Sequence, residues 1–107
     1  MILLDILTDL GDMKYDAQVI TLKVKSFSIL REIIGNEQII VQLPVTDGER
    51  RTRTTVGDLR RRIYELYPAI TTQRIVMTFA VNAKLANDKS VLNDFDEIAL
   101  LPPISGG

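Results

Sequence analysis

The chain has 107 residues, 46% of them hydrophobic and 25% charged, and a formal net charge of −1. This length and balance predict one soluble domain with a single core, and the near-neutral charge gives no reason to expect nucleic acid as a partner. The sequence contains neither cysteine nor histidine, which excludes disulfides, thiol nucleophiles and the usual zinc or iron–sulfur sites, and removes the usual general base. We therefore expect no bound metal. No pair of carboxylates, lysines or tyrosines stands out by its spacing as a self-contained catalytic centre.

Residues 1–17 are predicted to form an N-terminal extension. Its apolar residues recur at helical spacing before Gly11, which favours a short amphipathic helix, and they are Ile2, Leu3, Ile6, Leu7 and Leu10. An isolated helix of this length is only marginally stable in water. Its apolar face therefore has to be covered by the domain or by another chain, and contact between copies in a homo-oligomer is one such use.

The same extension does not have the pattern of a signal peptide, because it lacks a basic start and contains Asp5, Asp9 and Asp12. No apolar run in the sequence approaches the roughly 20 residues that span a bilayer. The expected location is the cytoplasm, with no membrane contact.

A domain over residues 18–101 is predicted to begin with a strand, a short helix and a second strand. Ser28 is placed to cap the short helix, and Gly35 suits the left-handed position at its end. Pro44 ends the second strand. The apolar residues that alternate with polar ones are Ile20, Leu22 and Val24 in the first strand and Ile39, Val41 and Leu43 in the second.

The main helix is predicted to start at Thr55 and to end at Pro68. Thr55 and Asp58 have the spacing of a capping box, although Asp is shorter than the usual Glu or Gln. The expected buried stripe consists of Val56, Leu59, Ile63, Leu66 and Tyr67.

An arginine cluster surrounds the start of this helix and the polar loop predicted over residues 46–53. Its members are Arg50, Arg51, Arg53, Arg60, Arg61 and Arg62. Such a cluster suits an acidic partner or a phosphate, and the plainer interpretation is a solvated face.

The second half of the domain is predicted to be mostly strand. Ile75, Met77, Phe79 and Val81 alternate as a third strand, turns and a brief strand near residues 84–85 follow, and residues 97–101 form the last strand. The order of elements favours an α+β domain in which one helix packs across a mixed sheet of four to five strands. A β-grasp is the compact arrangement that fits this order.

The tail, residues 102–107, is the most chemically suggestive segment. Pro102 and Pro103 fix φ and stiffen its root, whereas Gly106 and Gly107 have no Cβ and can pass extended through a narrow channel. At full extension such a tail reaches roughly 20 Å. It suits delivery of the Gly107 carboxylate into the active site of a second protein, and the alternative is an ordinary frayed terminus.

Several stretches carry a family resemblance: 27–35 with Arg31-Glu32, 55–68, 80–82, 92–98 and 101–107. Through them the sequence from Ile20 onward resembles the small sulfur-carrier subunits of molybdopterin synthase, the MoaD-like branch of the ubiquitin-like β-grasp proteins. Two features depart from the family pattern. The extension has no counterpart, and Phe95 stands where a Gly usually makes the turn before the last strand, so a positive φ there would be strained.

The resemblance implies a mechanism for molybdenum cofactor biosynthesis. An adenylating, E1-like partner that uses ATP and Mg²⁺ activates the Gly107 carboxylate, and a sulfur donor converts it to a thiocarboxylate. The thiocarboxylate then attacks a pyranopterin precursor in the large synthase subunit, with which a heterotetramer is expected. The chain itself would be a sulfur-donor subunit without catalytic residues of its own and without a permanently bound cofactor.

The resemblance also implies a docking patch of Phe27, Leu85 and Leu101, with Pro102 and Pro103 aiming the tail. Phe27 and Leu101 lie in strand-like stretches, so burial in the core is the alternative for both. Arg31 and Asn82 match family positions, with no role beyond turn or surface hydrogen bonding.

Other functions remain open from the sequence. A sulfur carrier for thiazole synthesis or tRNA thiolation keeps the chemistry and changes the product. A ubiquitin-like modifier would join Gly107 to a substrate lysine, and a plain interaction module would leave the tail inert.

Overall fold

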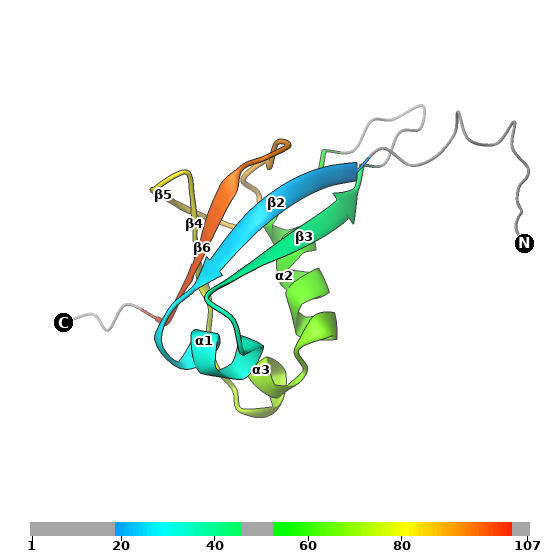
Figure 1. The fold of residues 1–107 in the computed structure, drawn as a ribbon. Coiled ribbons are helices and arrows are strands. Elements are labelled where there is room, and N and C mark those ends of the chain that lie inside the picture. The colour runs from blue at the N-terminus through cyan, green and yellow to red at the C-terminus, as the bar shows by residue number, and fades with distance from the viewer. Residues whose placement is uncertain (1–18, 46–52, 104–107) are drawn as a thin grey trace, which may run out of the picture.

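The computed structural model describes residues 19–45 and 53–103 (Figure 1). The predicted extension over residues 1–17, the polar loop up to residue 52 and the tip of the tail, including Gly106 and Gly107, lie outside the described residues.

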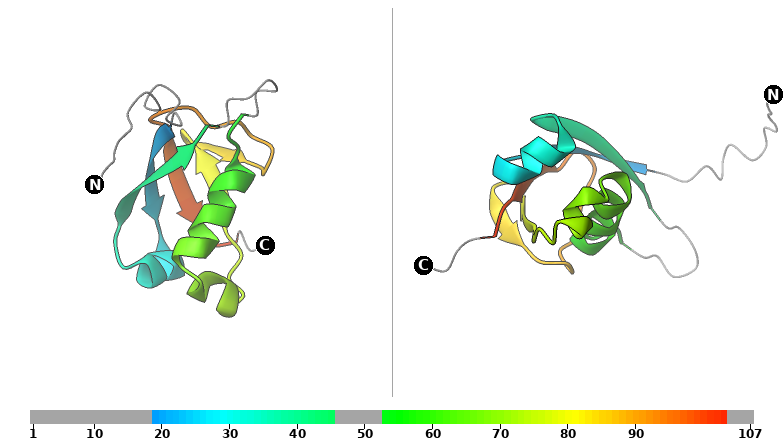
Figure 2. Two further views of the ribbon diagram at one scale, coloured as in Figure 1. Left: turned by 90° about the vertical axis from the view of Figure 1, so that its right-hand side faces the viewer. Right: turned by 90° about the horizontal axis from the view of Figure 1, so that it is seen from below.

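Eight elements follow one another along the described chain. They are β2 (Val19–Ser26), α1 (Ser28–Ile34), β3 (Gln38–Pro44), α2 (Val56–Leu66), α3 (Ala69–Thr72), β4 (Thr78–Val81), β5 (Lys84–Ala86) and β6 (Glu97–Leu101). The strands form one sheet in the order β3-β2-β6-β4-β5, in which β2 and β6 are parallel and the other neighbours antiparallel. The predicted α+β fold with a mixed sheet is confirmed, and α2 lies across one face of the sheet (Figure 2).

The core lies between this face of the sheet and the helices. On β2, burial alternates strictly from Ile20 to Ser26, as the period-two pattern predicts. The fully buried side chains include Leu22 and Val24 of β2, Leu59 and Ile63 of α2, Phe79 of β4, and Ile98 and Leu100 of β6. Because these residues come from both layers, the helix and the sheet share one core.

The start of α1 differs from the prediction. The N-cap position is Phe27, with φ −133°, and no side chain caps the helix, whereas Ser28 is the first helical residue with φ +59°. The Ser28 cap was therefore wrong: the buried Ser26 fixes the end of β2, and the chain turns directly into the helix. Gly35 has φ +87° and its N–H donates to the Arg31 carbonyl at 2.8 Å, which confirms the predicted helix end.

The start of α2 matches the prediction and its last turn does not. The Thr55 N–H donates to Asp58 Oδ2 at 2.9 Å and the Asp58 N–H to Thr55 Oγ1 at 3.4 Å, so the shorter Asp still closes the capping box. Leu66, predicted to be buried, is 42% exposed. The last turn of α2 lies beside β3, which is the edge of the described sheet, so no further described strand covers Leu66.

The segment after α2 contains a helix that sequence analysis missed. Pro68 ends α2 as predicted, but it also occupies the N-cap position of α3. The Ile75 N–H donates to the Ile70 carbonyl at 2.9 Å, so Ile75 closes this helical turn, and β4 starts at Thr78. The predicted third strand was therefore too long at its beginning. The brief strand near residues 84–85 is confirmed as β5.

Phe95 has φ +66°, as its place in a turn that usually takes Gly predicts. The turn is fixed to β2 from both sides. The Phe95 N–H donates to the Thr21 carbonyl at 2.6 Å, and the Thr21 N–H donates to Asp94 Oδ1 at 2.7 Å. These bonds hold the backbone in a conformation that Phe itself disfavours.

Candidate docking surface and tail root

The parallel pairing of β2 and β6 brings the end of β2 to the root of the tail. Ser26 pairs with Leu100, so the next residue of each strand, Phe27 and Leu101, lie at the same end of the sheet. On the other side of β6, Leu101 pairs with Thr78. Residues far apart in sequence therefore meet where the chain leaves the sheet toward Gly107.

These residues lie on the sheet face that the helices leave uncovered. On β6, Ile98 and Leu100 are buried in the core, so Ala99 and Leu101 point to the opposite face. Cross-strand pairs continue the same row, because Ala99 pairs with Ala80 and Ala80 pairs with Leu85. We call Phe27, Ala80, Leu85, Ala99 and Leu101 the outer-face patch.

The outer-face patch has the shape of a docking surface. Phe27 is 42% exposed and Leu85 is 65% exposed, so neither residue is in the core, and Leu101 is half-buried. Ala99, the buried Ala80 and the half-buried Thr78 lie between Leu101 and Leu85 on this face. An exposed apolar area with larger side chains at its margins suits contact with a second protein.

Pro102 and Pro103 follow Leu101 directly and belong to no strand. Because proline has no backbone N–H, the chain cannot continue the β6 ladder beyond this point. Pro102 is half-buried and Pro103 is exposed. The tail therefore leaves the domain at the margin of the outer-face patch, from a root of restricted φ.

Asn82 has a structural role beneath this surface. The sequence predicted only turn or surface hydrogen bonding for this residue. Asn82 and Ala83 both have positive φ, as a two-residue hairpin turn between β4 and β5 requires. The Asn82 amide donates to Asp96 Oδ1 at 2.9 Å and accepts from the Glu97 N–H at 3.0 Å. It thus ties the hairpin that carries Leu85 to the start of β6.

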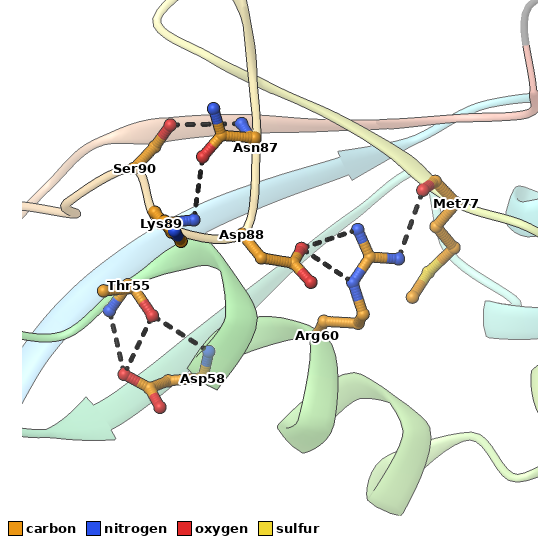
Figure 3. A network of polar contacts seen from close by, with 8 residues as sticks. All are labelled: Thr55, Asp58, Arg60, Met77, Asn87, Asp88, Lys89 and Ser90. Atoms are coloured by element: carbon orange, nitrogen blue, oxygen red, sulfur yellow. Dashed lines mark hydrogen bonds and ion pairs between the residues drawn. The ribbon is translucent and has the colours of Figure 1, made fainter.

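The arginine cluster divides between two places. Arg60 pairs with Asp88 at 2.9 Å and donates to the Met77 carbonyl at 3.3 Å (Figure 3). Its guanidinium carbon also lies 4.8 Å from the centroid of the Phe79 ring. Burial lowers the pKa of Arg60, but hydrogen bonds and charge interactions with Tyr64 and Asp88 outweigh it, so the pKa is raised and the cation persists. Arg60 is therefore a structural cation of the domain.

The remaining described arginines line a separate groove. Arg53, Arg61 and Arg62 border a hollow beside Leu43 and Pro44. Arg61 pairs with Asp58, and Arg62 pairs with Glu65 at 3.2 Å. Arg50 and Arg51 lie outside the described residues. The single basic face suggested by the sequence is thus not formed by the described arginines.

Among the described residues, no three acidic, histidine or cysteine side chains gather as metal ligands would. Within the same residues, no helix has the length and apolar character needed to cross a membrane.

The sheet order, the crossing helix and the position of the tail define the class of protein: a ubiquitin-like β-grasp domain with an apolar patch at its tail root. The sequence pattern of the ThiS family matches residues 24–107. The chain therefore belongs to the ThiS family.

Two similar proteins indicate which members of the ThiS family this chain resembles. The chain is 33% identical to the molybdopterin synthase sulfur carrier subunit of Dictyostelium discoideum, over 79% of this chain and 94% of that protein. It is 35% identical to the molybdopterin synthase sulfur carrier subunit of Caenorhabditis briggsae, over 83% of this chain and 100% of that protein. This confirms the resemblance found in the sequence.

Two solved structures are similar as well. One is the complex of subunits 1 and 2 of molybdopterin-converting factor from Helicobacter pylori, with a TM-score of 0.51, 25% identity, and coverage of 82% of this chain and 100% of that one. The other is small archaeal modifier protein 1 from Haloferax volcanii, with a TM-score of 0.61, 26% identity, and coverage of 81% and 99%.

Proposed function

We propose that this chain is the sulfur carrier subunit of a molybdopterin synthase and that the Gly107 carboxylate carries the sulfur. The observation that supports it best is the outer-face patch, an exposed apolar surface at the root of the tail whose sequence ends Gly106-Gly107. The relatives named above carry the same function in their names.

The chemistry begins with activation of the terminal carboxylate. An α-carboxyl group has a pKa of about 3.5, so Gly107 is anionic at neutral pH and resists nucleophilic attack. A carboxylate oxygen attacks the α-phosphorus of ATP in an adenylating partner with Mg²⁺, and pyrophosphate leaves. A sulfide-level donor then attacks the acyl carbon, AMP leaves with the bridging oxygen, and a thiocarboxylate remains.

In the second stage, sulfur is the nucleophile. The thiocarboxylate sulfur attacks a carbon of the pyranopterin precursor, which is bound to the large synthase subunit, and a C–O bond at that carbon breaks, its oxygen leaving as water. Hydrolysis of the resulting thioester then leaves the sulfur on the pterin and regenerates the Gly107 carboxylate. The catalytic acid and base belong to that subunit, since this chain has no histidine and no cysteine. Glycines at the tip let the tail pass a narrow entrance that a Cβ would obstruct.

Docking of the large subunit on the outer-face patch positions the tail. The similarity to subunit 1 or 2 within the Helicobacter pylori complex supports a partner of this kind. Leu85 and Phe27 supply the exposed apolar area, and Leu101 joins it to Pro102. We propose a heterotetramer of two carriers and two large subunits.

The test is the intact mass of the chain after incubation with ATP, Mg²⁺, an adenylating enzyme and a sulfur donor. We expect one terminal oxygen to be replaced by sulfur, and the chain without Gly107 to keep its mass. An unchanged mass with an adenylating enzyme that demonstrably binds the chain would contradict the proposal.

A second candidate function is protein modification, favoured by the similarity to small archaeal modifier protein 1. In that case the activated Gly107 forms an isopeptide bond with a lysine of another protein. Conjugates in cells that disappear when Gly106 and Gly107 are deleted would support modification. Transfer of sulfur to a pyranopterin by the purified synthase complex would support the carrier. A carrier for thiazole synthesis or tRNA thiolation would instead form the thiocarboxylate without binding the large synthase subunit.

A further inference from the structure

A groove runs along the outer edge of β3, on the side of α2. One hollow of about 370 Å³ is lined by Ile40, Val41 and Gln42 of β3 and by Arg62 and Leu66 of α2. A second hollow, of about 250 Å³, continues past Arg62 to Pro44, Arg53 and Arg61. Because Arg62 lines both, the two hollows form one feature, which we call the β3–α2 groove.

The β3–α2 groove is apolar at one end and charged at the other. Leu66 of α2 is 42% exposed. Ile40 is 55% exposed and borders the hollow from the edge of β3, with its side chain on the sheet face opposite α2, because its neighbour Val41 is buried in the core. At the other end stand Arg53, Arg61 and Arg62, with the carboxylates Asp58 and Glu65 paired to the last two. Each guanidinium has five N–H donors, so a second carboxylate can still bind.

We propose that residues 1–17 of the same chain bind in the β3–α2 groove. A helix formed by this segment would need an apolar surface on which to pack Ile6, Leu7 and Leu10. The groove offers such a surface at Leu66 and at the edge residue Ile40, which are both exposed. The segment contains four aspartates and one lysine, a net charge of −3, whereas the groove lining contains three arginines and two carboxylates, a net charge of +1. The two net charges are opposite, and Arg53 has neither of these two carboxylates as its ion-pair partner.

Residues 1–17 are attached to the domain close to the groove, so they can reach it within the same chain. Val19, the first described residue, pairs with Pro44, and Pro44 lines the groove. Strands lie about 4.8 Å apart and an extended residue spans about 3.3 Å, so a few residues suffice to cross the end of β3. A tether this short gives an effective concentration in the millimolar range, at which even a weak contact is populated.

The groove is separate from the proposed carrier surface. The family pattern begins at residue 24, so the extension is an addition to the family core. It joins the sheet at the start of β2, whereas the tail leaves from the end of the parallel strand β6, at the opposite end of the sheet (Figure 1). Binding of residues 1–17 in the groove therefore leaves the outer-face patch and the tail accessible.

The test uses a nitroxide spin label on the full chain. The chain has no cysteine, so Thr8→Cys provides a single attachment point within the extension. We expect the strongest loss of amide NMR signal at Ile40, Gln42, Arg62 and Leu66, and the weakest at Leu85 on β5, the far edge of the sheet. Signal loss centred on the outer-face patch, or spread evenly over the domain, would overturn the proposal.

Two matched variants separate the groove from a general apolar contact. Leu66→Ser in the labelled chain should restore the lost signals, whereas Leu85→Ser, at a more exposed leucine outside the groove, should not. Asp9→Lys should weaken the signal loss, since it reverses one charge of the extension. Signal loss that survives Leu66→Ser contradicts the proposal.

A mixture distinguishes one chain from two. Isotope-labelled chains without the nitroxide are mixed with nitroxide-labelled chains that carry no isotope. We expect no signal loss in the mixture, because each extension occupies its own groove. Signal loss at the groove in the mixture would show an exchange between copies and overturn the intramolecular contact. Neither result affects formation of the thiocarboxylate at Gly107.

Discussion

Phe95 holds a backbone conformation that residues with a Cβ rarely adopt, and its ring is 67% exposed. The left-handed region costs such residues about 1–2 kcal/mol, and little burial offsets that cost. We expect Phe95→Gly to raise the free energy of unfolding by about 1 kcal/mol. Urea denaturation with an unchanged slope measures it. Phe95→Ala is the control, because it removes the ring and keeps the Cβ. Equal stability of the two variants would contradict the backbone explanation.

Arg60 and Arg61 are neighbours in sequence with different surroundings, and they provide the second prediction. Arg60 pairs with Asp88 and covers the Phe79 ring with its side chain 25% exposed, whereas the Arg61 side chain is 71% exposed. We expect Arg60→Ala to lower the free energy of unfolding by about 1–2 kcal/mol. Arg61→Ala should change it by less than about 0.5 kcal/mol. Thermal and urea denaturation compare the two, and equal losses would contradict the structural role of Arg60.

At the scale of single residues, the sequence predicts those features that depend on a residue and its immediate neighbours in the chain. The Gly35 helix end follows from the residue and its neighbours alone. The positive φ of Phe95 does not, because Phe disfavours it, and only the family resemblance pointed to a turn there that usually takes Gly. The surroundings of Arg60 were not predictable either, because Asp88 and Met77 reach it only after the sheet has formed. The sequence grouped Arg53, Arg61 and Arg62 with Arg60 in one cluster, and it could not show that Arg60 lies apart, since that depends on where β3 lies relative to α2.

At the scale of elements, the start of α2 depends both on its own capping residues and on contacts with a turn that is distant in sequence. Its capping box closes as the sequence predicts (Figure 3). The turn over residues 87–90 packs on its first residues, because the Gly57 N–H donates to the Asp88 carbonyl at 3.0 Å. A Cβ on Gly57 would lie 3.3 Å from the Asp88 carbonyl oxygen, so a glycine permits this close approach. The N-terminus of α2 is thus fixed from two sides.

This arrangement leads to a third prediction. Thr55→Ala removes the acceptor for the Asp58 N–H and leaves an unpaired donor in the first turn of α2. We expect the free energy of unfolding to fall by about 1 kcal/mol. Thr72→Ala is the matched control, because its exposed hydroxyl only donates back to the Pro68 carbonyl within α3. Chemical denaturation should show a lower midpoint for Thr55→Ala alone, and a comparable loss in both would argue against the cap.

Elements that depend on tertiary packing were harder to predict. Met77 and Phe79 are buried as the predicted alternation requires, but Ala80 is buried too and Val81 is half-buried. Only Thr78–Val81 has a strand partner, because β6 ends at Leu101, opposite Thr78. Leu66 fits the apolar stripe of α2, but a stripe does not reveal that the described sheet stops at β3. Helical spacing therefore predicts which face is apolar and not how far that face is covered.

In the molecule as a whole, the two faces of the described sheet have different roles. Its inner face and the helices form the core, and its outer face carries the patch beside the tail. Sequence resemblance indicated Phe27, Leu85 and Leu101 as docking residues, and the cross-strand pairs bring them together with Ala80 and Ala99. The docking role itself remains a prediction that binding experiments test.

The last prediction concerns that surface. Leu85→Ser removes an apolar side chain that is 65% exposed, so the free energy of unfolding should change by less than about 0.5 kcal/mol. If the large synthase subunit docks on the outer-face patch, its affinity for this chain should fall about tenfold, as the loss of one large apolar contact does. Calorimetric titration with the large subunit measures the affinity. Leu66→Ser, in the β3–α2 groove, is the control and should bind as the unaltered chain does. Unchanged affinity for Leu85→Ser, or an equal loss of affinity for Leu66→Ser, would show that the large subunit does not dock on the outer-face patch.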